Sequence, residues 1–122
     1  MRAAVVLVLC AAALNAGAAE VLALDVVKKD QRIVINAAIS VLAPPADVYA
    51  ALIDYDNFTS WSDRYRDTGY IEPAADGRPR VQSYLEGCVL FFCRTVGRVA
   101  VLDLEPTEYI RAAAEPALSD VR

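Results

Sequence analysis

Between residues 45 and 61 the chain has the sequence Pro-Ala-Asp-Val-Tyr-Ala-Ala-Leu-Ile-Asp-Tyr-Asp-Asn-Phe-Thr-Ser-Trp. Val48, Leu52 and Tyr55 follow one another at spacings of four and three, which places them on one face of an α-helix. The proline that opens this stretch has the fixed φ favoured in a first helical turn. We therefore expect a helix over residues 46 to 55 that turns one apolar stripe toward a core.

A strand and a second helical turn flank this helix. Residues 32 to 41 carry an apolar residue at every odd position, which is typical of a strand with one buried face. Residues 20 to 31, just before it, show only a mixed pattern. Beyond the helix, Phe58 and Trp61 lie three residues apart and predict a short helical turn with two large apolar groups. The sequence thus predicts one strand followed by two short helices.

The residues after Trp61 are predicted to form strands separated by turns. The expected strands cover residues 65 to 72, 81 to 86, 95 to 104 and 109 to 114. Asp76-Gly77 is a strong hairpin signal, and Glu105-Pro106-Thr107 marks a later turn. We find no internal repeat or linker, so these strands predict a single α+β domain with a four-stranded antiparallel meander.

The N-terminal residues have the pattern of a secretory signal peptide. A basic residue precedes an apolar run from Ala3 to Leu14, which is short for a membrane span. Ala16 and Ala18 have the spacing that a signal peptidase requires. We therefore expect a signal peptide over residues 1 to 18 and an exported domain, periplasmic or secreted, over residues 19 to 122. A retained hydrophobic anchor is the alternative.

The composition limits the chemistry available to the chain. Its 122 residues include no histidine, which excludes a Ser-His-Asp triad, a Cys-His pair and any histidine-ligated metal site. We expect neither a metal nor a cofactor. The 12 basic residues are outnumbered by 16 acidic ones, and the net charge of −4 argues against nucleic acid as a partner.

The stretch from Pro45 to Trp61 resembles a known family. Its pattern Pro-x-x-Val-Tyr-x-x-Leu-x-Asp-Tyr-x-Asn-Phe-x-x-Trp is similar to that of the START-like or SRPBCC superfamily, notably its polyketide cyclase/dehydrase and coenzyme Q-binding members. The resemblance extends over residues 30 to 115. It implies a helix-grip fold, in which a curved antiparallel sheet wraps a long C-terminal helix and encloses an apolar cavity.

The end of the sequence departs from that family pattern. The sequence stops at Arg122, and Pro116 interrupts residues 112 to 122, so this segment cannot form the long gripping helix. A curved sheet with one uncovered apolar face exposes more apolar surface than a soluble monomer usually tolerates. We therefore expect a START-like domain that is incomplete at its C-terminus, or one whose open sheet face is covered by self-association.

The resemblance implies that the protein binds or carries a hydrophobic small molecule, such as a lipid, quinone or polyketide-like compound, in an apolar cavity. The expected cavity residues come from the apolar strand faces and the helical segment: Ile33, Ile35, Ile39, Leu52, Trp61, Val81, Tyr84, Val99 and Val101. Removal of apolar surface from water would drive binding at about 25 cal/mol per Å2, with a tyrosine or arginine orienting a polar end.

Two other interpretations stay open. A cyclase or dehydratase would need a phenolic acid and an arginine that polarises a carbonyl, and Tyr84, Arg94 and Arg98 have that chemistry. We assign no catalytic residue on this basis alone. The last interpretation is a truncated fragment with no function of its own.

Residues 89 to 92, Val-Leu-Phe-Phe, are four consecutive bulky apolar residues. Alternate residues of a strand point to opposite faces, so these four cannot all face one core. In a hairpin tip, Leu90, Phe91 and Phe92 would contact a bilayer interface or the mouth of the cavity. In the alternative, the segment is a strand buried on both faces. No basic cluster flanks it in the sequence, so electrostatic attraction to anionic lipid would be weak.

Two cysteines, Cys88 and Cys93, flank this apolar segment. On one continuous strand they would lie roughly 16 Å apart, which is too far for a bond. Across a hairpin tip they would face each other, and an oxidising compartment would then favour a disulfide. The sequence leaves both arrangements open.

Overall fold

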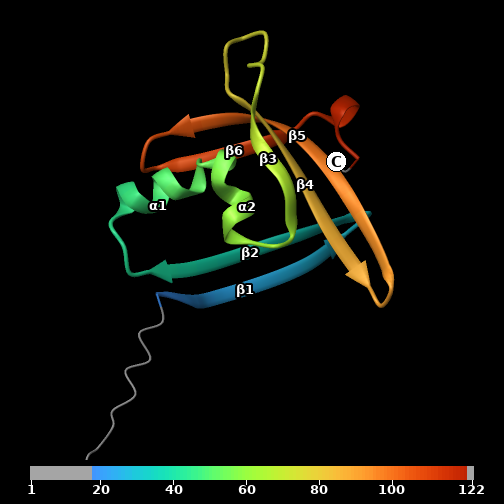
Figure 1. Cartoon of the computed structure of the whole chain (residues 1–122). Helices are drawn as coiled ribbons and strands as arrows, with labels where there is room; N and C mark the ends of the chain where they lie inside the picture. The colour runs from blue at the N-terminus through green and yellow to red at the C-terminus, as the bar shows by residue number, and fades with distance from the viewer. Residues whose placement is uncertain (1–17, 121–122) are drawn as a thin grey trace, which may run out of the picture. The chain divides into compact units, whose positions relative to one another are not determined.

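The computed structural model describes residues 18 to 120 and divides them into two compact units (Figure 1). The first unit extends to Leu42, and the second begins at Ala43. Apart from Ala18, the predicted signal peptide lies outside the described residues. None of the described helices is long and apolar enough to cross a membrane. The architecture is α+β, with two antiparallel sheets and two short α-helices.

The first unit is an antiparallel hairpin of strands β1 (Ala19–Lys29) and β2 (Arg32–Val41). Its turn places Asp30 at a φ of 56°, a left-handed conformation that aspartate tolerates better than most residues. β2 has the bounds that the alternation predicted, but the sequence pattern did not predict β1. A register shift between Val21 and Ala23 moves the apolar alternation of β1 out of phase, which is why its pattern is mixed. The helices therefore come after the second strand of the chain, β2, and not after its first strand as the sequence predicted.

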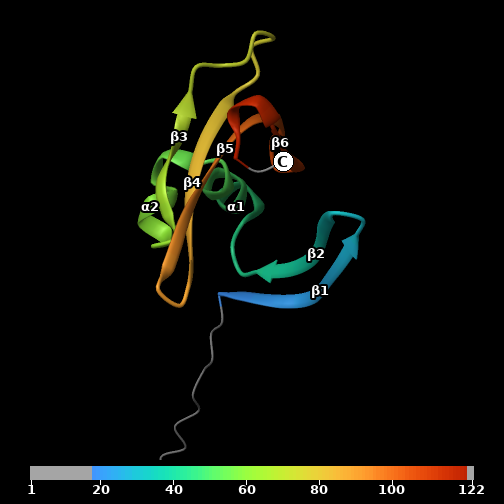
Figure 2. The same cartoon turned by 90° about the vertical axis from the view of Figure 1, so that its right-hand side faces the viewer.

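The register gives this hairpin one strongly apolar face. Ile35 pairs with Val26, and Ile33 and Ile39 lie on the same face of β2. The opposite face carries polar residues such as Asn36. Residues on both faces are exposed along the full length of both strands. The two strands bend together along their length (Figure 2).

The second unit contains three helical segments, a four-stranded sheet and a final short turn of helix. In chain order these are α1 (Pro45–Leu52), the 3-10 helix η1 (Tyr55–Asn57), α2 (Phe58–Trp61), β3 (Tyr65–Ile71), β4 (Arg80–Val89), β5 (Phe92–Glu105), β6 (Tyr109–Ala114) and the 3-10 helix η2 (Pro116–Leu118). Neighbouring strands pair in chain order, so the predicted meander is confirmed. β4 and β5 are both longer than expected, because they continue to the end of their shared hairpin.

α1 ends at Leu52, earlier than the apolar spacing suggested. The amide of Ile53 still donates to Tyr49 O at 3.2 Å, but the backbone of Asp54 leaves the helical region with a φ of −83° and a ψ of 62°. The Asp54 carboxylate accepts a hydrogen bond from Asn57 Nδ2 at 2.8 Å. This bond closes the turn that leads from α1 into η1.

The main cluster of buried residues in the second unit lies on one face of its sheet. Val81, Ala100 and Leu102 are buried there, and Leu102 has no accessible surface. Tyr55 of η1 and Ala112 of β6 pack against these three residues. We call this side of the sheet the helix-covered face.

Two side chains of β3 attach the helical segment to the sheet. Thr68 Oγ1 donates a hydrogen bond to Tyr55 O at 2.6 Å, and the Tyr70 hydroxyl donates to Ile53 O. Both acceptors are backbone carbonyls, that of Ile53 just after α1 and that of Tyr55 at the start of η1. The helical segment accordingly lies beside β3 in Figure 1 and in Figure 2. These bonds fix the position of Tyr55 over the core.

The chain after β6 runs back along β5. The amide of Glu115 donates to Val99 O at 2.8 Å, and Ser119 Oγ bonds to both the amide and the carbonyl of Val99. The amide of Asp120 donates to Gly97 O, and its carboxylate accepts from the Gly97 amide at 2.7 Å. As the proline indicated, the described part of this segment contains no long helix.

Candidate functional site

The structure places the predicted cavity residues on several different surfaces. Ile33, Ile35 and Ile39 belong to the apolar face of the β1–β2 hairpin, where they are 68%, 64% and 56% exposed. A hollow beside the turn of this hairpin is lined by Lys29, Asp30, Gln31, Arg32 and Val34 and by none of the predicted cavity residues. The three isoleucines thus share a face, as their spacing predicted, but this face is exposed and not buried as the alternation indicated.

The valines of the four-stranded sheet point in two directions. Val81 pairs with Ala100 and lies on the helix-covered face. Val99 and Val101 are the alternate residues of β5, so their side chains point to the other face. The prediction that all three line one cavity is therefore wrong. All three are buried, at 2%, 9% and 8% exposure respectively, and act as packing residues.

Tyr84 also lies on the face opposite the helical segment, because its partner in β5 is Gly97. A methyl group on Gly97 would lie 2.7 Å from the Tyr84 ring, so this glycine allows the ring to pack flat on the strand. The same glycine binds Asp120 through its backbone. Tyr84 thus stands beside the C-terminal segment and apart from the helix-covered face.

An aromatic cluster gathers where the helical segment meets β3. Its members are Tyr55, Phe58, Trp61, Tyr65 and Tyr70. Ring centroids lie 4.4 Å apart for Tyr55 and Phe58, 5.1 Å for Phe58 and Trp61, and 5.6 Å for Phe58 and Tyr65. Tyr70 packs edge-on against Tyr55 at 6.0 Å. Trp61 is 53% exposed, so the cluster has an open side.

A half-buried positive charge lies near Tyr55 of this cluster. Arg98 is a half-buried residue of the helix-covered face, and its Nη2 donates to Ala112 O at 2.9 Å. Burial raises the pKa of the Tyr55 phenol, and the nearby Arg98 guanidinium opposes this shift by lowering it. Tyr55 therefore stays protonated at neutral pH and can donate a hydrogen bond.

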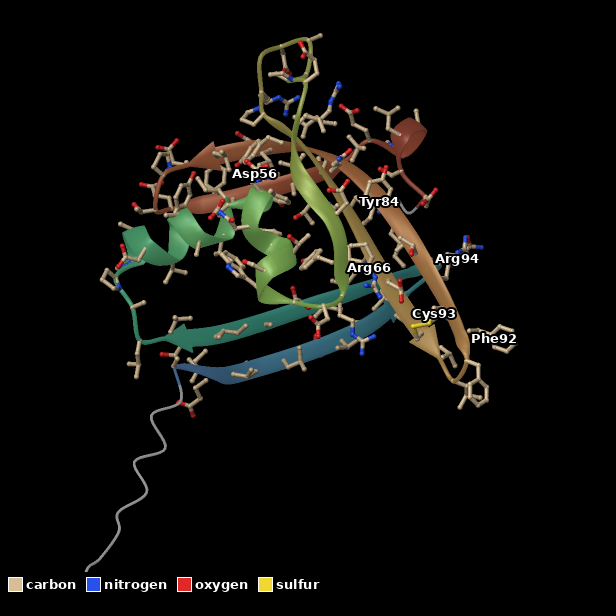
Figure 3. All side chains as sticks on the ribbon, viewed as in Figure 1. Asp56, Arg66, Tyr84, Phe92, Cys93 and Arg94 are labelled. Atoms are coloured by element: carbon tan, nitrogen blue, oxygen red, sulfur yellow. A yellow bond between two sulfur atoms is a disulfide. The ribbon has the colours of Figure 1, made fainter. Side chains whose placement is uncertain are left out.

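The two arginines with possible roles in carbonyl polarisation have different surroundings. Arg98 stands near a tyrosine on the covered face, whereas Arg94 is exposed close to the end of the β4–β5 hairpin (Figure 3). The tyrosine near Arg98 is Tyr55 and not Tyr84. The sequence did not reveal that Tyr55 and Arg98 are neighbours, because they are far apart in the chain. Only the register of β5 brings them to one face of the sheet.

Leu52 ends α1 and is 53% exposed. Leu52 and Trp61 are the two predicted cavity residues in the helical segment. Both side chains present apolar surface to solvent. Together with the aromatic cluster and Arg98, the arrangement offers exposed apolar surface, a phenolic donor and a cationic group. Such a set suits a planar apolar molecule that carries a carbonyl or carboxylate at one end.

The end of the β4–β5 hairpin is exposed. Val89 pairs with Phe92, and Leu90 and Phe91 form the turn between them, so the segment is a tip and not a strand buried on both faces. Directly behind the tip Cys88 pairs with Cys93, their Cα atoms are 4.0 Å apart, and their sulfurs form a disulfide (Figure 3). The hairpin alternative thus describes this region.

One grouping of potential metal ligands occurs among residues 18 to 120. It consists of Glu86, Cys88 and Cys93. Because the two sulfurs are bonded to each other, neither can act as a thiolate ligand. Glu86 also forms a bidentate pair with Arg66, with both nitrogen–oxygen distances at 2.8 Å. The grouping therefore does not constitute a metal site while the disulfide is formed.

Comparisons with known proteins identify no relative of this chain. No protein-family model matches it, no curated protein matches it in sequence, and no solved structure matches it in fold. The relationship to the START-like superfamily therefore stays a prediction from the sequence.

Proposed function

We propose that the protein binds a hydrophobic small molecule with a polar end, as a START-like carrier would. The observation that carries the proposal is the aromatic cluster, which is open at Trp61 and whose Tyr55 lies near the half-buried Arg98. Two short helices followed by an antiparallel meander are consistent with a helix-grip fold. The ligand classes that fit are quinones, fatty acids and polyketide-like aromatics.

The energetics of this site favour apolar ligands of moderate size. Each Å2 of apolar surface removed from water stabilises a complex by about 25 cal/mol, so a contact of roughly 150 Å2 contributes about 4 kcal/mol. A charge-assisted hydrogen bond from Arg98 to a carboxylate contributes about 1.5–3 kcal/mol more. The sum of roughly 5–7 kcal/mol corresponds to a Kd on the order of 10–100 μM for a fatty acid.

The proposal includes export of the protein to an oxidising compartment. The disulfide between Cys88 and Cys93 supports it, since disulfides persist mainly in secreted and periplasmic proteins. The N-terminal apolar run of the sequence supports it independently. A carrier in such a compartment would move hydrophobic molecules through water.

Trp61 provides a direct test, because it is the single tryptophan of the chain and belongs to the aromatic cluster. Its fluorescence is recorded during titration with decanoate and with a short-chain ubiquinone analogue. We expect a saturable change in emission with both probes. The Arg98→Gln variant should bind decanoate about ten-fold or more weakly, because it loses the charged donor. Arg111→Gln removes an exposed arginine of β6 and serves as the control.

Two results would contradict the proposal. One is an emission that stays constant with both probes up to their solubility limits. The other is equal weakening of decanoate binding in Arg98→Gln and Arg111→Gln, which would trace the effect to net charge and not to the site.

A second candidate function is an enzyme of the cyclase or dehydratase kind. The protonated Tyr55 phenol near the Arg98 guanidinium supports it, since such a pair can donate a proton and polarise a carbonyl. The Tyr55→Phe variant distinguishes it from the carrier. Turnover of an aromatic polyketide that is present in the wild-type protein and absent in Tyr55→Phe, with binding retained, would favour the enzyme.

A further inference from the structure

The apolar tip, residues 89 to 92 at the end of the β4–β5 hairpin, exposes more apolar surface per residue than any neighbouring segment of its unit. Val89, Leu90, Phe91 and Phe92 are 76%, 87%, 96% and 82% exposed. The packing of the sheet does not require these side chains, because the buried core lies on the helix-covered face at the other end of β5. Their apolar character therefore calls for a partner outside the fold.

The backbone of the tip reinforces this point. Leu90 has a φ of 55°, a left-handed conformation that favours glycine or asparagine. A leucine in this conformation costs about 1–2 kcal/mol relative to glycine. The turn thus carries a bulky apolar residue at a position where a small or polar one would stabilise the hairpin.

The disulfide gives the tip a defined shape. Cys88 and Cys93 are joined across the two strands immediately behind the pair Val89–Phe92. The cross-link holds the strand ends together, so the apolar side chains project as one unit from a rigid base. The apolar tip therefore loses little conformational entropy when it leaves water and binds a partner.

The dimensions of the tip match a lipid interface. With a rise of about 3.4 Å per residue, the turn projects roughly 7 Å beyond the disulfide. An interfacial segment buries its apolar side about 5–10 Å into the boundary between headgroups and acyl chains. The tip is convex and comprises four residues, whereas a stable protein interface needs about 800 Å2 from each partner. These sizes favour a bilayer over a protein surface.

Polar groups begin directly behind the disulfide, where lipid headgroups would lie. Arg94 pairs with Gly87 in the next rung of the ladder and is exposed. The ion pair of Arg66 and Glu86 follows one rung further back, with its nitrogen–oxygen distance at 2.8 Å. The hairpin therefore changes from apolar to charged within the thickness of a headgroup layer. Arg94 stands at the right height to contact a lipid phosphate.

We infer that the apolar tip inserts reversibly into the interface of a lipid bilayer and docks the protein there. The inference stands on the hairpin alone and does not require the proposed ligand site. It adds a membrane surface to the molecules that this protein recognises. The apolar side chains supply the attraction, and Arg94 orients the hairpin toward the headgroups.

Vesicle binding tests this inference with a tip-specific probe. In the double variant Trp61→Phe/Phe91→Trp the only tryptophan lies in the tip. Its emission is measured while vesicles of phosphatidylcholine, and of phosphatidylcholine with phosphatidylglycerol, are added to the full chain. We expect a blue shift with both kinds of vesicle, because apolar insertion drives binding.

Variants of the wild-type protein separate insertion from unspecific adsorption. Leu90→Asn/Phe91→Asn removes the apolar groups while placing a residue that tolerates positive φ at position 90, so the hairpin should stay folded. We expect co-sedimentation with vesicles to fall at least ten-fold. Leu118→Asn changes an exposed leucine of η2 and should leave binding unchanged.

Three results would overturn the inference. The first is a constant emission maximum of the tip tryptophan with both kinds of vesicle. The second is equal vesicle binding by Leu90→Asn/Phe91→Asn and the wild type. The third is a wild-type dimer that this variant converts to a monomer while neither form binds vesicles, which would make the tip a contact between protein chains. All three leave the titration at Trp61 unaffected.

Discussion

Replacement of Thr68 by valine tests how the sheet positions the candidate site. The Thr68 side chain is 8% exposed, and its hydroxyl donates to Tyr55 O at 2.6 Å. Valine keeps the shape but removes the donor. The Tyr55 carbonyl also accepts from the Phe58 amide, so it does not become fully unsatisfied. We therefore expect a loss of about 1 kcal/mol in the free energy of unfolding, the net value of one hydrogen bond.

For a unit of this size, a loss of about 1 kcal/mol lowers Tm by roughly 4–8 °C. Thermal unfolding followed by circular dichroism measures it, and Trp61 emission reports whether the aromatic cluster loosens. Thr95→Val, at an exposed position of β5, is the matched control and should change Tm little. Equal shifts in the two variants would refute the idea that this bond holds the helical segment. A loss well above 2 kcal/mol would show that the Tyr55 carbonyl lacks its second donor.

Three further predictions concern the core, the tyrosines and the crowded glycine. Leu102→Ala should lower the free energy of unfolding, measured by chemical denaturation, by about 2–5 kcal/mol, because truncation of this fully buried side chain leaves a cavity in the core. A loss under about 1 kcal/mol would contradict the assigned core. Burial raises the pKa of Tyr70 above its ordinary value of 10.0. The protonated Tyr70 phenol therefore stabilises the fold fully below pH 10, and this stabilisation is lost as pH rises through the folded-state pKa. Tm should accordingly fall more steeply above pH 10 in the wild type than in Tyr70→Phe, and parallel profiles would refute this. Gly97→Ala should destabilise the protein by about 1–3 kcal/mol, but much less in a Tyr84→Ala background, because the added methyl meets the Tyr84 ring; additive losses would exclude that clash.

Local patterns of the sequence predicted most of the secondary structure. The alternation over residues 32 to 41 corresponds to β2, and turn signals separate the four strands of the meander. β1 escaped detection because its bulge interrupts the alternation. The end of α1 was misplaced because the Asp54–Asn57 hydrogen bond overrides an apolar spacing that would otherwise continue the helix.

The site was harder to predict because it depends on which face each strand residue takes. Val99 to Leu102 are all buried, so alternation cannot tell the two faces of β5 apart. Only the pairing of Val81 with Ala100 shows which residues share the helix-covered face. The same applies to Arg98, whose chemistry was visible in the sequence but whose nearby tyrosine was not. The cysteine pair was recognisable from its spacing around an apolar segment, yet the turn at Leu90 decides the disulfide.

The most direct test of the account is a nuclear magnetic resonance titration of the nitrogen-15-labelled protein with decanoate. The indole resonance of Trp61 and the side-chain Nε resonance of Arg98 report on the two ends of the proposed site. The account predicts that both shift with one common Kd while resonances of β1 and of the apolar tip stay in place. Shifts confined to residues 89 to 92, or an Arg98 resonance that never moves, would contradict it.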